Sequence, residues 1–167
     1  MGIASKLRAL ATHEARRLVL PLAALTALST VGTAAAPTLA GDQPLVLVAM
    51  SPRLGFLAIA AHQVALLPFL VVGLVRLCVA DPFHFALGRR HGARAIARLP
   101  GRLGRGAAWL QRKAGRSLPL LVFVRPNGTN LAIAGASSTS RAHVAVADVV
   151  GTAVYLLLVH TAGASLV

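Results

Sequence analysis

The run from Leu54 to Ala80 constrains the fold of this chain more than any other segment, because it is apolar almost throughout. Its strongly polar side chains are only His62, Gln63 and Arg76. A helix needs about 20 mostly apolar residues to cross a hydrocarbon core of ~30 Å, and this run supplies them. It ends at Asp81 in the sequence D-P-F-H-F-A-L-G-R-R-H-G. The change from apolar to basic sequence predicts a helix that crosses a bilayer over 54–80 and leaves it at Asp81.

The composition places the chain among integral membrane proteins. Hydrophobic residues make up 56% of it and charged residues only 13%, against roughly 25% charged in soluble globular domains. The mean hydropathy is +0.73. Aromatic residues are 4%, so the apolar content is aliphatic. We therefore expect an all-α integral membrane protein with a single membrane domain over 18–167.

The positive charge is concentrated beside the apolar runs. The net charge is +13, from 17 Lys and Arg residues against four acids, which are Glu14, Asp42, Asp81 and Asp148. Nine of the 17 bases lie between Arg89 and Arg116, with no acid among them. Such clusters follow from the positive-inside rule and from attraction to anionic headgroups. We expect membrane lipid with anionic headgroups as the partner of this segment, and no nucleic acid.

Two further apolar runs predict spans. Residues 18–40 form either a cleaved signal peptide ending at Thr38-Leu39-Ala40 or an uncleaved first span. The run is longer than a usual signal-peptide core and other membrane segments follow, so the uncleaved span is favoured. Residues 142–163 predict the last span. Residues 1–17 are expected as an amphipathic helix on the membrane surface. The distribution of bases predicts a multi-pass protein of the plasma membrane, with its N-terminus and residues 89–116 in the cytoplasm.

Two apolar stretches are too short to cross a bilayer. Residues 44–53 form either a re-entrant limb or the first turns of a longer, proline-kinked span. Residues 118–136 are interrupted by R-P-N-G-T-N. Because Pro126 lacks a backbone donor and Gly128 favours a break, this stretch is not expected to form one straight helix. It is either a broken span or a re-entrant hairpin.

The interruption at 125–130 supplies the best candidate site. An arginine at membrane depth is a functional hypothesis by default, and the guanidinium fork of Arg125 suits a phosphate. Asn127 and Asn130 would donate hydrogen bonds to the same group. Asp42 or Asp148 would titrate. A central Asp costs about 2.5–3.5 kcal/mol in insertion assays, so Asp148 should face the interior of the bundle.

Other polar residues have simpler interpretations. Arg76 lies near the end of its run and is expected to reach the headgroups. Asp81 is expected to cap a helix at the headgroup boundary. The sequence also spaces arginines four apart, at Arg90, Arg94, Arg98 and Arg102. On a helix this spacing makes a basic stripe that lies on anionic lipid or binds a headgroup.

The order of these motifs resembles the DedA family, also called the VTT or SNARE-associated membrane-protein family, over roughly residues 80–159. That family carries G-D-x-x-x-Y-x-x-G-R-x-x-G, and the corresponding positions here are Ala80, Asp81, Phe85, Gly88, Arg89 and Gly92. Later family motifs correspond to Arg125-Pro126, Ala134-Gly135-Ala136-Ser137, Arg141, Asp148, Gly151 and Tyr155.

The chain departs from the family pattern at three places. Asn127 or Asn130 stands where the family has a second arginine, and Asp148 replaces an asparagine. Ala40 replaces a proline before Gly41-Asp42. These changes fit either altered ion-pair chemistry or a loss of transport.

The resemblance implies a carrier that moves phospholipid or polyprenyl-phosphate headgroups between leaflets, with proton coupling. The alternative is a non-transporting membrane scaffold whose basic segment is a docking surface. Assembly into a homo-oligomer stays open. An enzyme is not expected, because the six histidines show no metal-ligand spacing and Ser137-Ser138 lacks a base partner. Cys78 is the only cysteine, which excludes an internal disulfide and a thiolate cluster. No cofactor or metal is expected.

Overall fold

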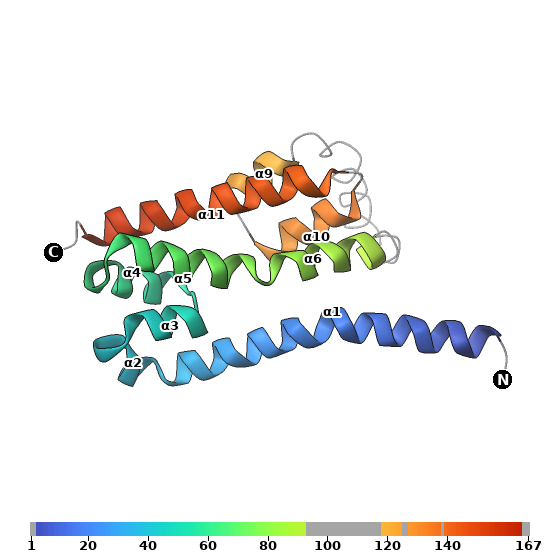
Figure 1. Cartoon of the computed structure of the whole chain (residues 1–167), viewed down its shortest axis with the longest axis horizontal. Helices are drawn as coiled ribbons and strands as arrows, with labels where there is room; N and C mark the ends of the chain where they lie inside the picture. Colours follow the sequence, from blue (N-terminus) through green and yellow to red (C-terminus); the bar gives the residue numbers. More distant parts are fainter. Residues whose placement is uncertain (1–2, 93–117, 125–126, 138, 165–167) are drawn as a thin grey trace, which may run out of the picture.

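Helices account for every regular element in the part of the chain that the structure describes. This computed structural model describes residues 3–92, 118–124, 127–137 and 139–164, with side chains from Arg16 onward (Figure 1). The elements are α1 (Ile3–Ala34), α2 (Ala36–Asp42), α3 (Pro44–Met50), α4 (Leu54–Gln63), α5 (Leu66–Cys78), α6 (Asp81–Leu87), the π-helical turn η1 (Gly88–Gly92), α9 (Leu118–Val124), α10 (Gly128–Ala136) and α11 (Arg141–Ala164). The all-helical class expected from the sequence is therefore confirmed for these residues.

Three stretches of helix are long and apolar enough to cross a membrane. They are Arg16–Ala34, Leu66–Gly92 and Arg141–Gly163. The first belongs to α1, the second joins α5, α6 and η1, and the third is α11. Figure 1 shows α11 along one side of the α5–α6 rod and α1 along the other. The length and composition of these helices therefore agree with the expectation of several apolar spans.

The second of these stretches is shifted from its predicted position. The continuous helix expected over 54–80 is two helices, because α4 ends at Gln63 and α5 begins at Leu66. Pro68 explains the break, since a proline ring clashes with the carbonyl four residues earlier, which belongs to Val64. Val64 is extended, with φ −125° and ψ 138°, and its carbonyl accepts a hydrogen bond from His160 Nε2 at 3.2 Å.

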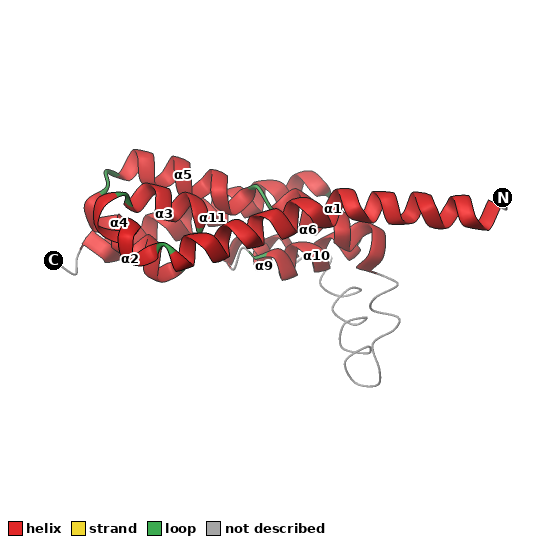
Figure 2. Cartoon of the chain, turned by 90° about the horizontal axis from the view of Figure 1, so that it is seen from below, coloured by secondary structure: helices red, strands yellow, loops and turns green. Residues whose placement is uncertain are grey.

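The N-terminal segment is not a separate surface helix. Residues 3–17 belong to the same α1 helix as the first candidate span, and this helix extends beyond the rest of the bundle at its N-terminal end (Figure 2). The expected run to residue 40 is also interrupted, because α1 ends at Ala34 and Pro37 lies in the first turn of α2. Pro37 favours a new helix start at this point.

The two short apolar stretches are broken as the prolines predict. Helix α3 ends at Met50, and residues 51–53 separate it from α4, so 44–53 does not continue into a kinked helix. Helices α9 and α10 are separated at Asn127, whose backbone is extended (φ −155°, ψ 156°). The predicted interruption of 118–136 is therefore confirmed. The re-entrant placement of both stretches stays a prediction.

The two limbs around Asn127 pack against different partners. Helix α9 lies against α11, whereas α10 lies against α6 and η1. Residues 93–117, which carry Arg94, Arg98 and Arg102 of the predicted stripe, lie outside the described residues, as do Arg125 and Pro126.

Two groups of buried apolar side chains hold the bundle together. One joins α3, α4, α5 and α11 through Val48, Leu57, Ala60, Ala61, Phe69, Leu156 and Val159. The other joins α6, α9, α10 and α11 through Phe85, Val122, Leu131, Ala134 and Val144. Large aliphatic side chains also face outward, with more than 60% exposure at Leu20, Leu54, Leu67, Val75, Leu120, Val124, Val146 and Leu158. So much exposed apolar surface is unusual in a water-soluble monomer.

The motif glycines mark close contacts between helices. A Cβ atom at Gly88 would collide with the backbone of Ala132, and one at Gly135 would collide with the backbone of Phe85. Gly151 has the same relation to Phe123. These glycines let α6 and η1 approach α10, and let α11 approach α9, so the motif positions have a packing role.

Replacing Gly135 with alanine is expected to destabilise the protein by about 1–3 kcal/mol, the usual range for overpacking. The Phe85 backbone cannot move aside as a flexible side chain would. Gly55→Ala is the matched control, because Gly55 is helical and nothing lies within 4 Å of a Cβ built there. It should leave stability unchanged or raise it by up to ~1 kcal/mol. Thermal unfolding in detergent measures both; equal effects would contradict the packing role.

Candidate site between the α5–α6 junction and α11

The junction between α5 and α6 presents a thiol and a carboxyl group on one face. Helix α5 ends at Cys78 and α6 begins at Asp81. Residues three apart on a helix are neighbours on its surface, so both side chains project in the same direction. Pro82 has no backbone N–H, so the Cys78 carbonyl loses its usual helical donor. The junction is thus a local weakness in the middle of the Leu66–Gly92 stretch.

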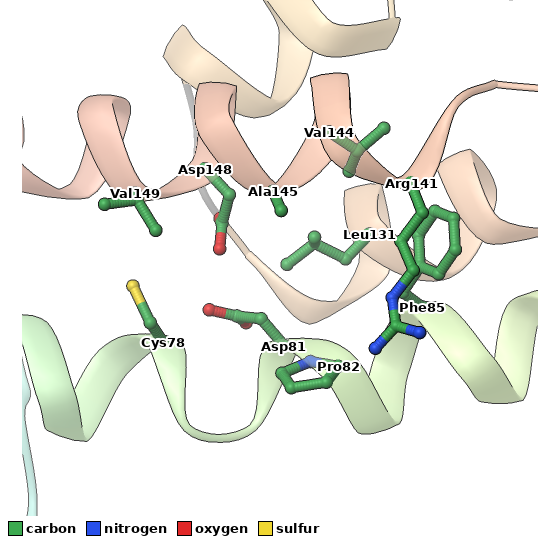
Figure 3. Close-up of a pocket in the computed structure, with 10 residues that line it drawn as sticks. All are labelled: Cys78, Asp81, Pro82, Phe85, Leu131, Arg141, Val144, Ala145, Asp148 and Val149. Carbon is green, nitrogen blue, oxygen red and sulfur yellow. The ribbon is translucent and has the colours of Figure 1, made fainter.

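Asp148 of α11 faces this junction. Its side chain is only 3% exposed, as the sequence predicted for an acid inside an apolar span. Figure 3 shows Asp148 and Asp81 directed toward one another, with the Cys78 thiol beside them. One ligand atom from each of the three side chains lies within 4.8 Å of the other two. We refer to Cys78, Asp81 and Asp148 as the carboxylate–thiol cluster.

The cluster is short of compensating groups. Asp81 and Asp148 face each other, and Oδ1 of Asp148 is buried with no hydrogen-bond partner among the described residues. Asp148 is buried and Asp81 is half-buried, and two adjacent carboxylates in such a place are not both stable as anions unless a proton or a cation lies between them. The chemistry of the cluster therefore requires an additional positive species.

Two cavities contain residues of the cluster, and a third lies beside one of them. The acidic cavity, of about 230 Å³, contains all three cluster residues together with Pro82, Phe85, Leu131, Arg141, Val144, Ala145 and Val149. The large cavity, of about 560 Å³, is lined by Pro52, Arg76, Leu77, Ala80, Asp81, His84, Val124, Asn127, Gly128, Thr152 and Tyr155. The basic cavity, of about 410 Å³, is lined by Pro82, Phe85, Ala86, Arg89, Arg90, Thr139, Ser140 and Arg141.

Shared residues place the cavities in a row. Pro82, Phe85 and Arg141 line both the basic and the acidic cavity. Asp81 lines both the acidic and the large cavity. Polar side chains therefore occur along α6 from its arginine-rich end at η1, past the cluster, to the residues beside Asn127.

Contrary to the prediction, the Arg76 side chain does not extend toward the end of its helix. Its terminal nitrogen donates hydrogen bonds to the carbonyl of Leu25 at 3.1 Å, to Ser29 Oγ at 2.8 Å and to the carbonyl of Met50 at 3.1 Å. The side chain thus ties α5 to α1 and α3. Its Nε atom is buried without a hydrogen-bond partner among the described residues. Arg76 is a structural cation on the wall of the large cavity.

The prediction that the Asp81 side chain caps a helix is wrong. Ala80 is the N-cap residue of α6, and no side chain bonds to the backbone there. Asp81 instead lies near the middle of a stretch long enough to cross a membrane and faces another acid. The error follows from the position of the helix break, which moved the whole stretch toward the C-terminus.

The other predicted site residues are distributed unevenly. Asn127 lines the large cavity, but its side chain accepts a hydrogen bond from the Asn130 backbone at 2.8 Å and so caps α10. Asp42 is exposed at the end of α2 and lines none of the three cavities. Arg125 lies outside the described residues. Of the predicted pair Asp42 and Asp148, only Asp148 lies in the cluster.

Some residues of the DedA-like motifs line the cavities, and others do not. Arg89 and Arg141 line the basic cavity, whereas Gly88, Gly92, Gly135 and Gly151 occupy close helix contacts. The position of Cys78 beside two acids was not predicted from the sequence. The signal that was present is the spacing of Cys78 and Asp81, which puts two ligand-type side chains on one helical face.

Comparisons with protein-family models, with curated proteins and with solved structures found no match to this chain.

Proposed function

We propose that this protein is a DedA-type carrier that moves lipids with phosphate-bearing headgroups, such as phospholipids or polyprenyl phosphates, between the leaflets of a membrane. The observation that carries the proposal is the row of three cavities between α6, α10 and α11. A headgroup needs a polar path between apolar helices, and the row supplies one. We further propose a multi-pass protein of the plasma membrane with a cytoplasmic N-terminus, from the asymmetry of Lys and Arg.

Cationic side chains stand at both ends of this path. Arg89, Arg90 and Arg141 line the basic cavity, and Arg76 lines the large one. Arginine is well suited to phosphate because its planar fork donates two hydrogen bonds at once. The large aliphatic side chains on the outer surface allow acyl tails to stay in lipid while the headgroup moves inside.

Arg125 keeps the central binding role that the sequence suggested. Its described neighbours Val124 and Asn127 both line the large cavity, which supports a role for this loop at the path. We expect Arg125→Ala to abolish headgroup movement, because it removes the fixed cation of the loop. Arg125→Lys should restore it only in part, because an ammonium lacks the planar fork.

Reconstitution into vesicles tests the function. The protein is inserted into liposomes that contain a fluorescent phospholipid, and a membrane-impermeant reductant reports the fraction of label that reaches the outer leaflet with time. The parent should move lipid well above the rate of protein-free vesicles. Arg53→Ala is the matched control for Arg125→Ala, because Arg53 is exposed and lines none of the three cavities.

Two outcomes would contradict the proposal. A parent protein that moves lipid no faster than protein-free vesicles would leave the membrane scaffold, with its basic docking surface, as the better account. An Arg125→Ala variant that folds and moves lipid like the parent would remove the binding role of Arg125.

A further inference from the structure

We propose that the carboxylate–thiol cluster of Cys78, Asp81 and Asp148 binds a divalent transition-metal ion of the zinc class. The sequence alone predicted no metal, because it shows one cysteine and no ligand motif. The fold changes this by bringing an acid of α11 to the α5–α6 junction. The proposal concerns binding of a cation and does not depend on whether lipid moves.

The geometry of the three donors suits a small ion. The ligand atoms lie within 4.8 Å of one another, while ligands around tetrahedral zinc lie roughly 2.0–2.3 Å from the metal. Small rotations of the three side chains would bring the donors to bonding distance. Cys78 and Asp81 come from one helical face and Asp148 from another helix, so a bound ion would join α5, α6 and α11.

Asp148 provides the independent observation that a ligand belongs here. Its side chain is only 3% exposed, and its Oδ1 atom has no hydrogen-bond partner among the described residues. In Figure 3 this carboxyl group points into the cluster. A buried acceptor of this kind, directed at a second carboxyl group and a thiol, is left without its normal partner unless a cation or a shared proton lies between the two acids.

The donor set selects among cations. Calcium and magnesium prefer six or more oxygen ligands, and a thiol contributes nothing to such a site. One sulfur with two carboxylate oxygens suits zinc or cobalt. With three protein ligands, a fourth position would face the acidic cavity of about 230 Å³.

Among the residues that the structure describes, no positive side chain occupies this position. Arg141 lines the same cavity, but its guanidinium lies beside Phe85 and Pro82, at the end away from Cys78 (Figure 3). Arg76 is directed to Ser29 and to two backbone carbonyls. Neither arginine provides the cation that the cluster requires.

Cobalt(II) is the probe of choice, because the chain has a single cysteine. The full-length protein is purified in detergent, stripped with a chelator and titrated with Co²⁺. A sulfur-to-cobalt charge-transfer band in the near ultraviolet then reports coordination by Cys78 alone. We expect this band to saturate at one Co²⁺ per chain and to disappear when Zn²⁺ is added.

Variants separate coordination from folding. Asp148→Asn keeps the side-chain shape and should weaken Co²⁺ binding at least about 100-fold, beyond the 10–100-fold typical of residues that only support ligands. Cys78→Ser should abolish the charge-transfer band. Asp42→Asn is the matched control, because Asp42 is exposed and distant from the cluster. Helix content by circular dichroism shows whether each variant is folded.

Absence of the charge-transfer band in the folded parent would overturn the proposal and leave a shared proton as the species between the two acids. Unchanged affinity in a folded Asp148→Asn variant would overturn it as well. Failure of lipid movement with intact Co²⁺ binding would affect the proposed function and leave the metal site standing.

Discussion

Asp148→Asn is expected to abolish headgroup movement while making the chelator-stripped protein more stable. Asp148 is buried, and one of its oxygens lacks a hydrogen-bond partner among the described residues. Replacing it with a neutral amide of the same shape removes a desolvated acid. We expect the free energy of unfolding to rise by about 1.5–3 kcal/mol, because the amide N–H can donate to the Asp81 carboxylate and hydrogen bonds to charged groups contribute in this range. The same change removes the charge at the centre of the proposed path.

Two measurements on one preparation test this prediction. Thermal unfolding in detergent with chelator gives the stability, and the vesicle assay gives the rate of lipid movement. Asp42→Asn serves as the control, since this acid is exposed and should change neither quantity. A stable Asp148→Asn variant that moves lipid at the parent rate would show that the cluster is not part of the path.

Arg76→Met is expected to cause a large loss of stability. Its terminal nitrogen donates to Leu25, Ser29 and Met50, which connects α5 to α1 and α3. Hydrogen bonds to charged groups contribute about 1.5–3 kcal/mol each, and methionine keeps only the aliphatic stem. Because such contributions are not additive, we expect a total loss of about 3–5 kcal/mol, in the range for breaking a buried polar network.

The control for Arg76 is another arginine of the same region. Arg53 is exposed in the link between α3 and α4, so Arg53→Met should leave the free energy of unfolding within about 0.5 kcal/mol of the parent value. Arg76→Lys should recover part of the loss through a single donor group. An Arg76→Met variant as stable as the parent would show that these contacts do not hold α1 against the bundle.

Charge and hydropathy were sufficient to predict the class of the fold and the last long helix. The apolar run at 142–163 has no proline, and it forms α11. The break at Asn127 was also predictable, because Pro126 and Gly128 act locally on the backbone. These features could be predicted because they depend only on residues that are close together in the sequence.

The position of the second long stretch was not recognised from hydropathy. The apolar content of 54–80 is uniform, but Pro68 disrupts the helix at Val64 and starts α5 at Leu66. The stretch then continues through Asp81 to Gly92. Hydropathy is averaged over a window of residues, so it does not register a helix break that a single proline causes.

The cluster itself depends on tertiary packing. Cys78 and Asp81 meet Asp148 only because α11 lies along the α5–α6 rod (Figure 1). No local pattern links residues so far apart in the chain. The sequence identified Asp148 as a buried acid, but its partner could not be predicted without the arrangement of the helices.

Modification of Cys78 tests the central claim most directly, because the only cysteine of the chain lies in the middle of the proposed path. The protein in vesicles is treated with a small water-soluble methanethiosulfonate reagent while a chelator keeps the thiol free, then returned to assay buffer beside a mock-treated sample. The account predicts complete modification by mass spectrometry and a fall in lipid movement to the rate of protein-free vesicles. A fully modified protein that moves lipid like the mock-treated sample, or a thiol that the reagent reaches only after unfolding, would contradict a water-filled path past Cys78, Asp81 and Asp148.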